Sequence, residues 1–152
     1  MVALGAVSTC ALVACGSNDR AGGAPPSATT PAGSCRNLPE AVGPDVAGSL
    51  AQTDSGGTFC LHLGQSLDVF LSVPLPEADT GRWTPVRASD GAVLHVVPSG
   101  ALTLPRGVTA AIFAATQAGT SELTSTRPPC AAAAPSGCPA GQGWRVIIVV
   151  KG

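Results

Sequence analysis

Apolar and polar side chains alternate along much of the chain after Cys35, with the period of two that is typical of β-strands. The clearest example is the segment 66–73, where an apolar residue occupies every second position. One face of this segment carries Leu67, Val69, Leu71 and Val73, and the other carries Ser66, Asp68, Phe70 and Ser72. The last segment, 144–150, alternates similarly, with Val146, Ile148 and Val150 opposing Ile147 and Val149. We therefore expect both segments to be strands.

Weaker patterns of the same kind extend the prediction to the rest of the chain. The expected strands are 48–52, 58–63, 66–73, 82–86, 93–97, 108–115, 121–126 and 144–150. Phe59, Leu61 and Leu63 share one face of the second, Val108, Ala110, Ile112 and Ala114 share one face of the sixth, and Leu123 points inward from the seventh. No window has the caps and the 3.6-residue period of a helix, and the nearest rival, 108–118, contains β-branched residues that favour a strand.

These strands are short and separated by turn sequences such as Asp54-Ser55-Gly56-Gly57 and Ser89-Asp90-Gly91. About seven strands over roughly 105 residues predict an all-β, antiparallel, immunoglobulin-like β-sandwich. A small β-barrel is the alternative fold.

The first residues have a different character, because the run from Val2 to Ala14 is uncharged and largely apolar. It is too short to span a bilayer, which takes roughly 20 residues, but it fits the apolar part of a signal peptide. It ends in Leu12-Val13-Ala14-Cys15, which resembles the lipobox of bacterial lipoproteins. The resemblance implies cleavage before Cys15 and acyl chains on that residue. With two or three chains the membrane anchor is nearly permanent.

This reading places the protein on the outer face of the bacterial cytoplasmic membrane. It divides the chain into a signal peptide, 1–14, a lipidated flexible tether rich in Gly, Ala, Pro, Ser and Thr, 15–34, and a folded domain, 35–152. The pattern departs from a usual signal peptide in having no basic residue before Arg20. Cys10 is rejected as the lipidated residue, since it lacks a preceding Leu and small residue at the required positions. The alternative is an ordinary secretory signal in which Cys15 is an incidental thiol.

The composition of the chain excludes one class of function, the binding of nucleic acids. The net charge is −1, charged residues make up 11% of the chain and aromatic residues 3%. The chain thus lacks the basic stripe and the stacking aromatics that nucleic-acid binding needs. We expect a monomer without a cofactor, bound to the membrane by its acyl chains and to a protein or cell-wall partner of unknown identity.

Four cysteines follow Cys15, namely Cys35, Cys60, Cys130 and Cys138. In an exported chain this even number predicts two disulfides, and three pairings are possible. We favour Cys130–Cys138 because a short Ala/Pro/Ser/Gly loop separates the two, and Cys35–Cys60 then follows by elimination. A metal site is the alternative, but the chain has no C-x-x-C pair.

Catalytic chemistry has little support in the sequence. His62 and His95 are the two histidines, and each is read as a surface residue of a strand. No G-x-S-x-G, H-E-x-x-H, P-loop or Rossmann glycine pattern occurs. A pair of acidic residues acting as an acid and a base is the alternative, but nothing in the sequence singles out such a pair. We therefore expect a protein that is not an enzyme and has no catalytic or metal-binding residues.

The segment 63–151 resembles the chagasin-like cysteine-protease inhibitors, which are immunoglobulin-like sandwiches. The resemblance rests on Leu63-Gly64-Gln65-Ser66-Leu67, Asp79-Thr80-Gly81-Arg82-Trp83, Ala118-Gly119-Thr120, Arg127-Pro128 and the final strand 144–150. It implies three loops that meet a partner. The candidate residues in them are Thr80, Gly81, Trp83, Gly107, Arg127 and Pro128.

The loops also depart from the family. Ala78-Asp79 stands where the inhibitors have Asn-Pro, Arg82 replaces an aromatic residue and Pro129 replaces a Trp. Two readings follow: a non-catalytic binding module on the cell envelope, which we prefer on the sequence alone, and an inhibitor of cysteine proteases. Trp83 and Trp144 are also expected as core or loop-packing aromatics, Arg127 as the partner of an acid, and Gly107 as part of a plain turn.

Overall fold

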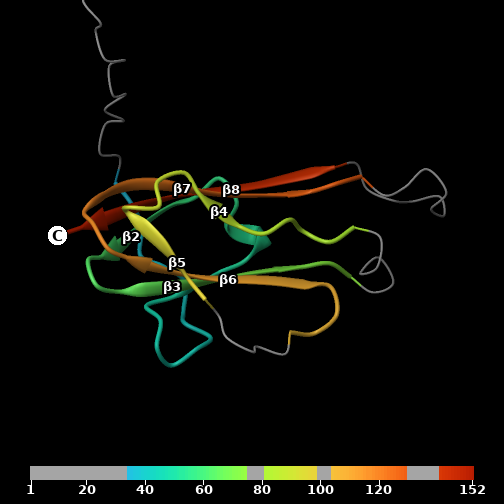
Figure 1. The fold of residues 1–152 in the computed structure, drawn as a ribbon, viewed down its shortest axis with the longest axis horizontal. Helices are drawn as coiled ribbons and strands as arrows, with labels where there is room; N and C mark the ends of the chain where they lie inside the picture. The colour runs from blue at the N-terminus through green and yellow to red at the C-terminus, as the bar shows by residue number, and fades with distance from the viewer. Residues whose placement is uncertain (1–33, 75–80, 99–103, 130–140) are drawn as a thin grey trace, which may run out of the picture. The chain divides into compact units, whose positions relative to one another are not determined.

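The computed structural model describes residues 34–74, 81–98, 104–129 and 141–152. Within these ranges, eight strands form two four-stranded sheets that pack face to face (Figure 1). The first sheet has the order β1 (Ser49–Leu50), β3 (Ser66–Ser72), β6 (Val108–Ala115), β5 (Leu94–Val97). The second has the order β2 (Thr58–His62), β8 (Gln142–Lys151), β7 (Gly119–Arg127), β4 (Arg87–Ala88). The predicted all-β sandwich is confirmed.

Both sheets are mixed and not purely antiparallel. β1 pairs with β3 in parallel and β2 pairs with β8 in parallel, while the other neighbours are antiparallel. A short 3₁₀ turn, η1 (Gln52–Asp54), separates β1 from β2, and the chain changes sheet there. Each of these two N-terminal strands therefore covers one edge of a different sheet.

The core lies between the sheets and follows the predicted alternation closely. Leu67, Val69 and Leu71 on β3 are fully buried, as are Val146 and Ile148 on β8. The burial follows because successive side chains of a strand point to opposite faces. Leu123 on β7 is likewise buried, as expected.

Two details of the inward faces could not be foreseen. Leu63 lies beyond the end of β2 and is 51% exposed, whereas Phe59 and Leu61 on that strand are buried. On β6 the core receives Phe113 and Ala115, so the opposite set, Val108, Ala110, Ile112 and Ala114, is directed to the outer face. That outer set is nevertheless half-buried.

The predicted strand 82–86 is wrong, because the structure places the short strand β4 immediately after it. Trp83 and Val86 are buried in the core without forming a ladder. Pro85 has no N–H group to donate to a neighbouring strand, which accounts for the interruption. The expected strand 48–52 is likewise shorter, since it is reduced to β1.

The N-terminal segment of the described domain is tied to β2. Cys35 and Cys60 form a disulfide with their Cα atoms 5.2 Å apart, which confirms that pairing. Beside it, the N–H of Arg36 donates to the carbonyl of Thr58 at 3.1 Å, and the N–H of Cys60 donates to the carbonyl of Arg36 at 2.8 Å. The Arg36 guanidinium also lies 4.3 Å from the centre of the Phe59 ring.

Several predictions lie outside the described residues. They are the signal peptide and lipobox, 1–15, most of the tether, the pair Cys130–Cys138, and Thr80. Within the described ranges, no helix is long and apolar enough to cross a membrane.

Candidate binding surface at one end of the sandwich

The stems of the three predicted loops meet at one end of the sandwich. At this end β3 and β7 finish and β6 and β8 begin (Figure 1, right). The N–H of Val73 donates to the carbonyl of Gly107 at 3.0 Å, which joins the first stem to the second. The Thr109 hydroxyl donates to the carbonyl of Trp83 at 3.0 Å, which joins them again. The three segments that the resemblance assigned to a partner thus share one end.

Arg127 links the first stem to the third from a buried position. The residue is only 6% exposed, and its Nε donates to the carbonyl oxygen of Gly81 at 2.8 Å. A Cβ atom added at Gly81 would lie 3.2 Å from that Nε, so the guanidinium fills the space that a side chain at 81 would need. Arg127 and Gly81 therefore support the loops from inside.

Trp83 has a similar supporting role. It is 6% exposed, and its indole N–H donates to the carbonyl of Ser72 at 3.3 Å. Trp144 is buried as well, with its indole N–H directed to the carbonyl of Ala51 at 2.9 Å. The reading of both tryptophans as packed aromatics is confirmed, and each satisfies its polar atom as a buried indole must.

Gly107 has a backbone reason to be glycine. Its φ is 81°, a conformation that other residues rarely adopt, and it is buried where the chain turns into β6. The reading of Gly107 as part of a turn agrees with this geometry.

A cluster of hydroxyl groups, missed in the sequence, connects the first stem to the end of β7. The Ser125 hydroxyl donates to the carbonyl of Thr84 at 2.7 Å, and the Thr84 hydroxyl accepts from the N–H of Thr126 at 3.0 Å. The N–H of Thr84 in turn donates to the carbonyl of Thr126 at 2.8 Å. Serine and threonine are common on strand surfaces, so nothing in the sequence distinguished these three.

A different set of residues is accessible at this end. Arg82, Pro128 and Arg106 are exposed, and Leu104 is 38% exposed. Only Pro128 belongs to both the predicted candidates and this exposed set. Among the described residues, a partner approaching this end would meet these side chains, with Gly81, Trp83 and Arg127 behind them.

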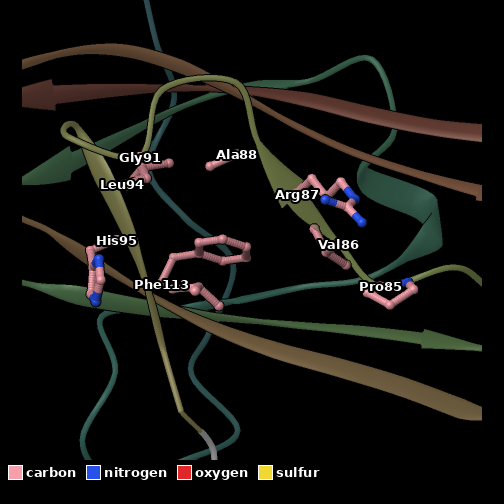
Figure 2. A pocket seen from close by; sticks show the side chains of 9 residues that line it. Pro85, Val86, Arg87, Ala88, Gly91, Leu94, His95 and Phe113 are labelled. Carbon is pink, nitrogen blue, oxygen red and sulfur yellow. The ribbon is translucent and has the colours of Figure 1, made fainter.

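A pocket elsewhere on the molecule lies between the edge strands β4 and β5 (Figure 2). It has a volume of about 470 Å³ and is floored by Phe113, with Arg87 and His95 at its sides. Arg87 and His95 lie on opposite sides of the Phe113 ring and do not converge on a common point (Figure 2). Within the described ranges, no three His, Cys, Asp or Glu residues are grouped to hold a metal ion.

Comparison with known proteins gives a fold and not a sequence family. The sequence matches no protein-family model, and no curated protein matches it. The cysteine protease inhibitor EhICP2 from Entamoeba histolytica is similar in structure, with a TM-score of 0.50 and 9% identity, over 68% of this chain and 93% of that one.

Two further structures are less similar. One is the solution structure of Amebosin, with a TM-score of 0.42 and 14% identity, over 72% of this chain and 100% of that one. The other is PbICP-C in complex with falcipain-2, with a TM-score of 0.41 and 11% identity, over 78% and 95%. The described domain therefore shares the sandwich fold of EhICP2, in agreement with the fold that the sequence resemblance implied.

Proposed function

We propose that the domain is a non-catalytic binding module that inhibits cysteine proteases by placing its loop-bearing end over their active-site cleft. The proposal rests on one observation: hydrogen bonds hold the three loop stems together at one end of the sandwich, in a fold shared with a cysteine protease inhibitor. Inhibition of this kind needs no catalytic group on the inhibitor, because a rigid surface only has to exclude the substrate.

Rigidity is what the buried contacts contribute. Arg127 and Thr109 donate to the backbone carbonyls of Gly81 and Trp83, so the segment 81–83 is held by two other parts of the chain before a partner arrives. Ordering loops on binding lowers affinity, and a preorganised surface avoids much of that cost. The described residues placed to contact the protease are then the exposed ones at this end, which include Arg82, Leu104, Arg106 and Pro128.

Titration of active papain with the full chain tests the proposal. We expect stoichiometric inhibition that weakens about tenfold or more when Arg82→Glu and Leu104→Asp are combined, which is a loss of about 1.4 kcal/mol. Lys151→Glu is the matched control, since Lys151 is exposed at the C-terminal end of β8, away from the loop stems, and should not change inhibition. No inhibition at micromolar concentrations would end the inhibitor reading and leave a module for another envelope partner.

We also propose that Cys15 anchors the protein to the outer face of the cytoplasmic membrane. The support is the sequence Leu12-Val13-Ala14-Cys15 and its resemblance to a lipobox. Trypsin cuts after Arg20, so mass spectrometry of the envelope protein should find Cys15–Arg20 as the leading peptide, carrying acyl chains. An unmodified peptide that still contains Ala14 would contradict the proposal, and Cys15→Ser should release the protein from the membrane.

A further inference from the structure

The outer face of the sheet β1-β3-β6-β5 carries a partly enclosed pocket of about 300 Å³, on the side of the sheet that faces away from the sandwich core. The loop before β1 forms one wall and lies outside β3 and β6 (Figure 1). Its apolar lining comes from Pro44 and Val46 on the loop, and from Phe70, Ala110 and Ile112 on the strands. The volume is at the lower end of the range for small-molecule sites, roughly 300 to 1,000 Å³.

The loop wall is fixed at its C-terminal end and braced further back. The N–H of Ala47 donates to the carbonyl of Ser66 at 2.7 Å, and the N–H of Val42 donates to the Ser49 hydroxyl at 2.7 Å. The pocket is therefore a built feature of the fold. The loop wall also covers Ala110 and Ile112, which accounts for the partial burial of these two residues on the outward face of β6.

One polar group in this lining is unusual. Asp68 is only 4% exposed, and its Oδ1 is buried without a hydrogen-bond partner among the described residues. A buried carboxylate oxygen without a donor is costly, so such groups are rare unless something else satisfies them. Asp45 also lines the pocket, and no lining residue is basic.

We propose that this pocket binds a small ligand with a primary ammonium group and an apolar body, and that the ammonium donates to Asp68. The apolar walls fit the body, the two carboxylates favour a cation, and an ammonium supplies the donor that Oδ1 lacks. Neither an anion nor a neutral hydrocarbon would satisfy that oxygen. The site is separate from the loop-bearing end and does not depend on protease inhibition.

NMR titration of the ¹⁵N-labelled full chain with hexylammonium tests this inference. We expect saturable shifts of the amide signals of Phe70, Ala110 and Ile112. Hexan-1-ol, which matches the chain length without the charge, should bind about tenfold more weakly or worse, and hexanoate should not bind. Equal binding of the alcohol, or no saturable shift with hexylammonium, would overturn the proposal.

Two substitutions locate the site. Asp68→Asn keeps the shape of the side chain and should remove the preference for ammonium over alcohol. Ala110→Leu should fill the pocket and abolish binding, whereas Ala114→Leu, on the same outward face of β6 but outside the pocket, should leave binding unchanged. Undiminished binding by a folded Ala110→Leu variant would place the ligand elsewhere and refute the assignment, even if Asp68→Asn failed to fold.

Discussion

Removal of the disulfide Cys35–Cys60 should destabilise the domain by about 3.5 kcal/mol. The two cysteines are 25 positions apart in the sequence, and the bond closes that loop in the unfolded chain as well. The loop-closure relation gives an entropy near 12 cal/mol/K for this length, which is about 3.5 kcal/mol at 25 °C. Cys35→Ala together with Cys60→Ala is the appropriate change, because it leaves no reactive thiol at either position.

The folded state should tolerate this substitution. The two backbone hydrogen bonds between Arg36 and β2 remain, so the N-terminal segment keeps its place beside the strand. Most of the loss should therefore arise from the greater freedom of the unfolded chain. In urea unfolding the midpoint should fall, and the slope should stay the same or rise, because the unfolded chain without its cross-link exposes more surface. The melting temperature should drop by roughly 10 °C or more.

Mass spectrometry after alkylation should first establish that the bond is present in the parent protein. A loss below about 1 kcal/mol in the double variant would then refute the reasoning, because the loop-closure term would not operate at its expected size. A clear fall in the urea slope would also contradict it, because an unfolded chain released from its cross-link should expose at least as much surface as before.

Three further outcomes are expected. Cys130→Ala with Cys138→Ala, made in the background that lacks the first bond, should cost about 2.5 kcal/mol in urea unfolding if those residues are paired, and nothing if they are not. Gly48→Ala should cost about 1 to 3 kcal/mol, because the new Cβ would lie 2.4 Å from a neighbouring side-chain carbon, whereas Gly91→Ala meets nothing within 4 Å and should be neutral. Trp144→Phe should cost about 1 to 3 kcal/mol by leaving a backbone carbonyl without its donor; an unchanged melting temperature would count against that hydrogen bond.

The sequence predicted the sandwich well where one face of a strand is apolar and the other is not. In β3 the alternation of Leu67, Val69 and Leu71 with largely polar neighbours leaves one possible orientation, and the structure has it. In β6 both faces are apolar, because the outward one is covered by a loop, so periodicity alone could not assign the inner face. The parallel pairing of β1 with β3 and of β2 with β8 could not be predicted either, since it depends on where the chain crosses between the sheets.

The candidate site was predicted in part. The resemblance gathered Gly81, Gly107 and Arg127 into three loops, and the structure brings the stems of those loops to one end. The packing of Trp83 was expected, but the burial of Arg127 was not, because it depends on the carbonyl group of Gly81, which a distant segment supplies. A sequence motif does not show whether its tryptophan or arginine faces a partner or is buried and supports the loop.

That division between support and contact decides how inhibition must be tested. Replacing Arg127 or Trp83 would remove buried hydrogen bonds, so weaker inhibition by such a variant would report loop collapse as readily as lost contact. Arg82 and Leu104 lie on the accessible side of the same end, and surface substitutions there change stability by little. If inhibition weakens at these two positions while the unfolding midpoint is unchanged, the effect belongs to the contact with the protease and not to the fold that presents it.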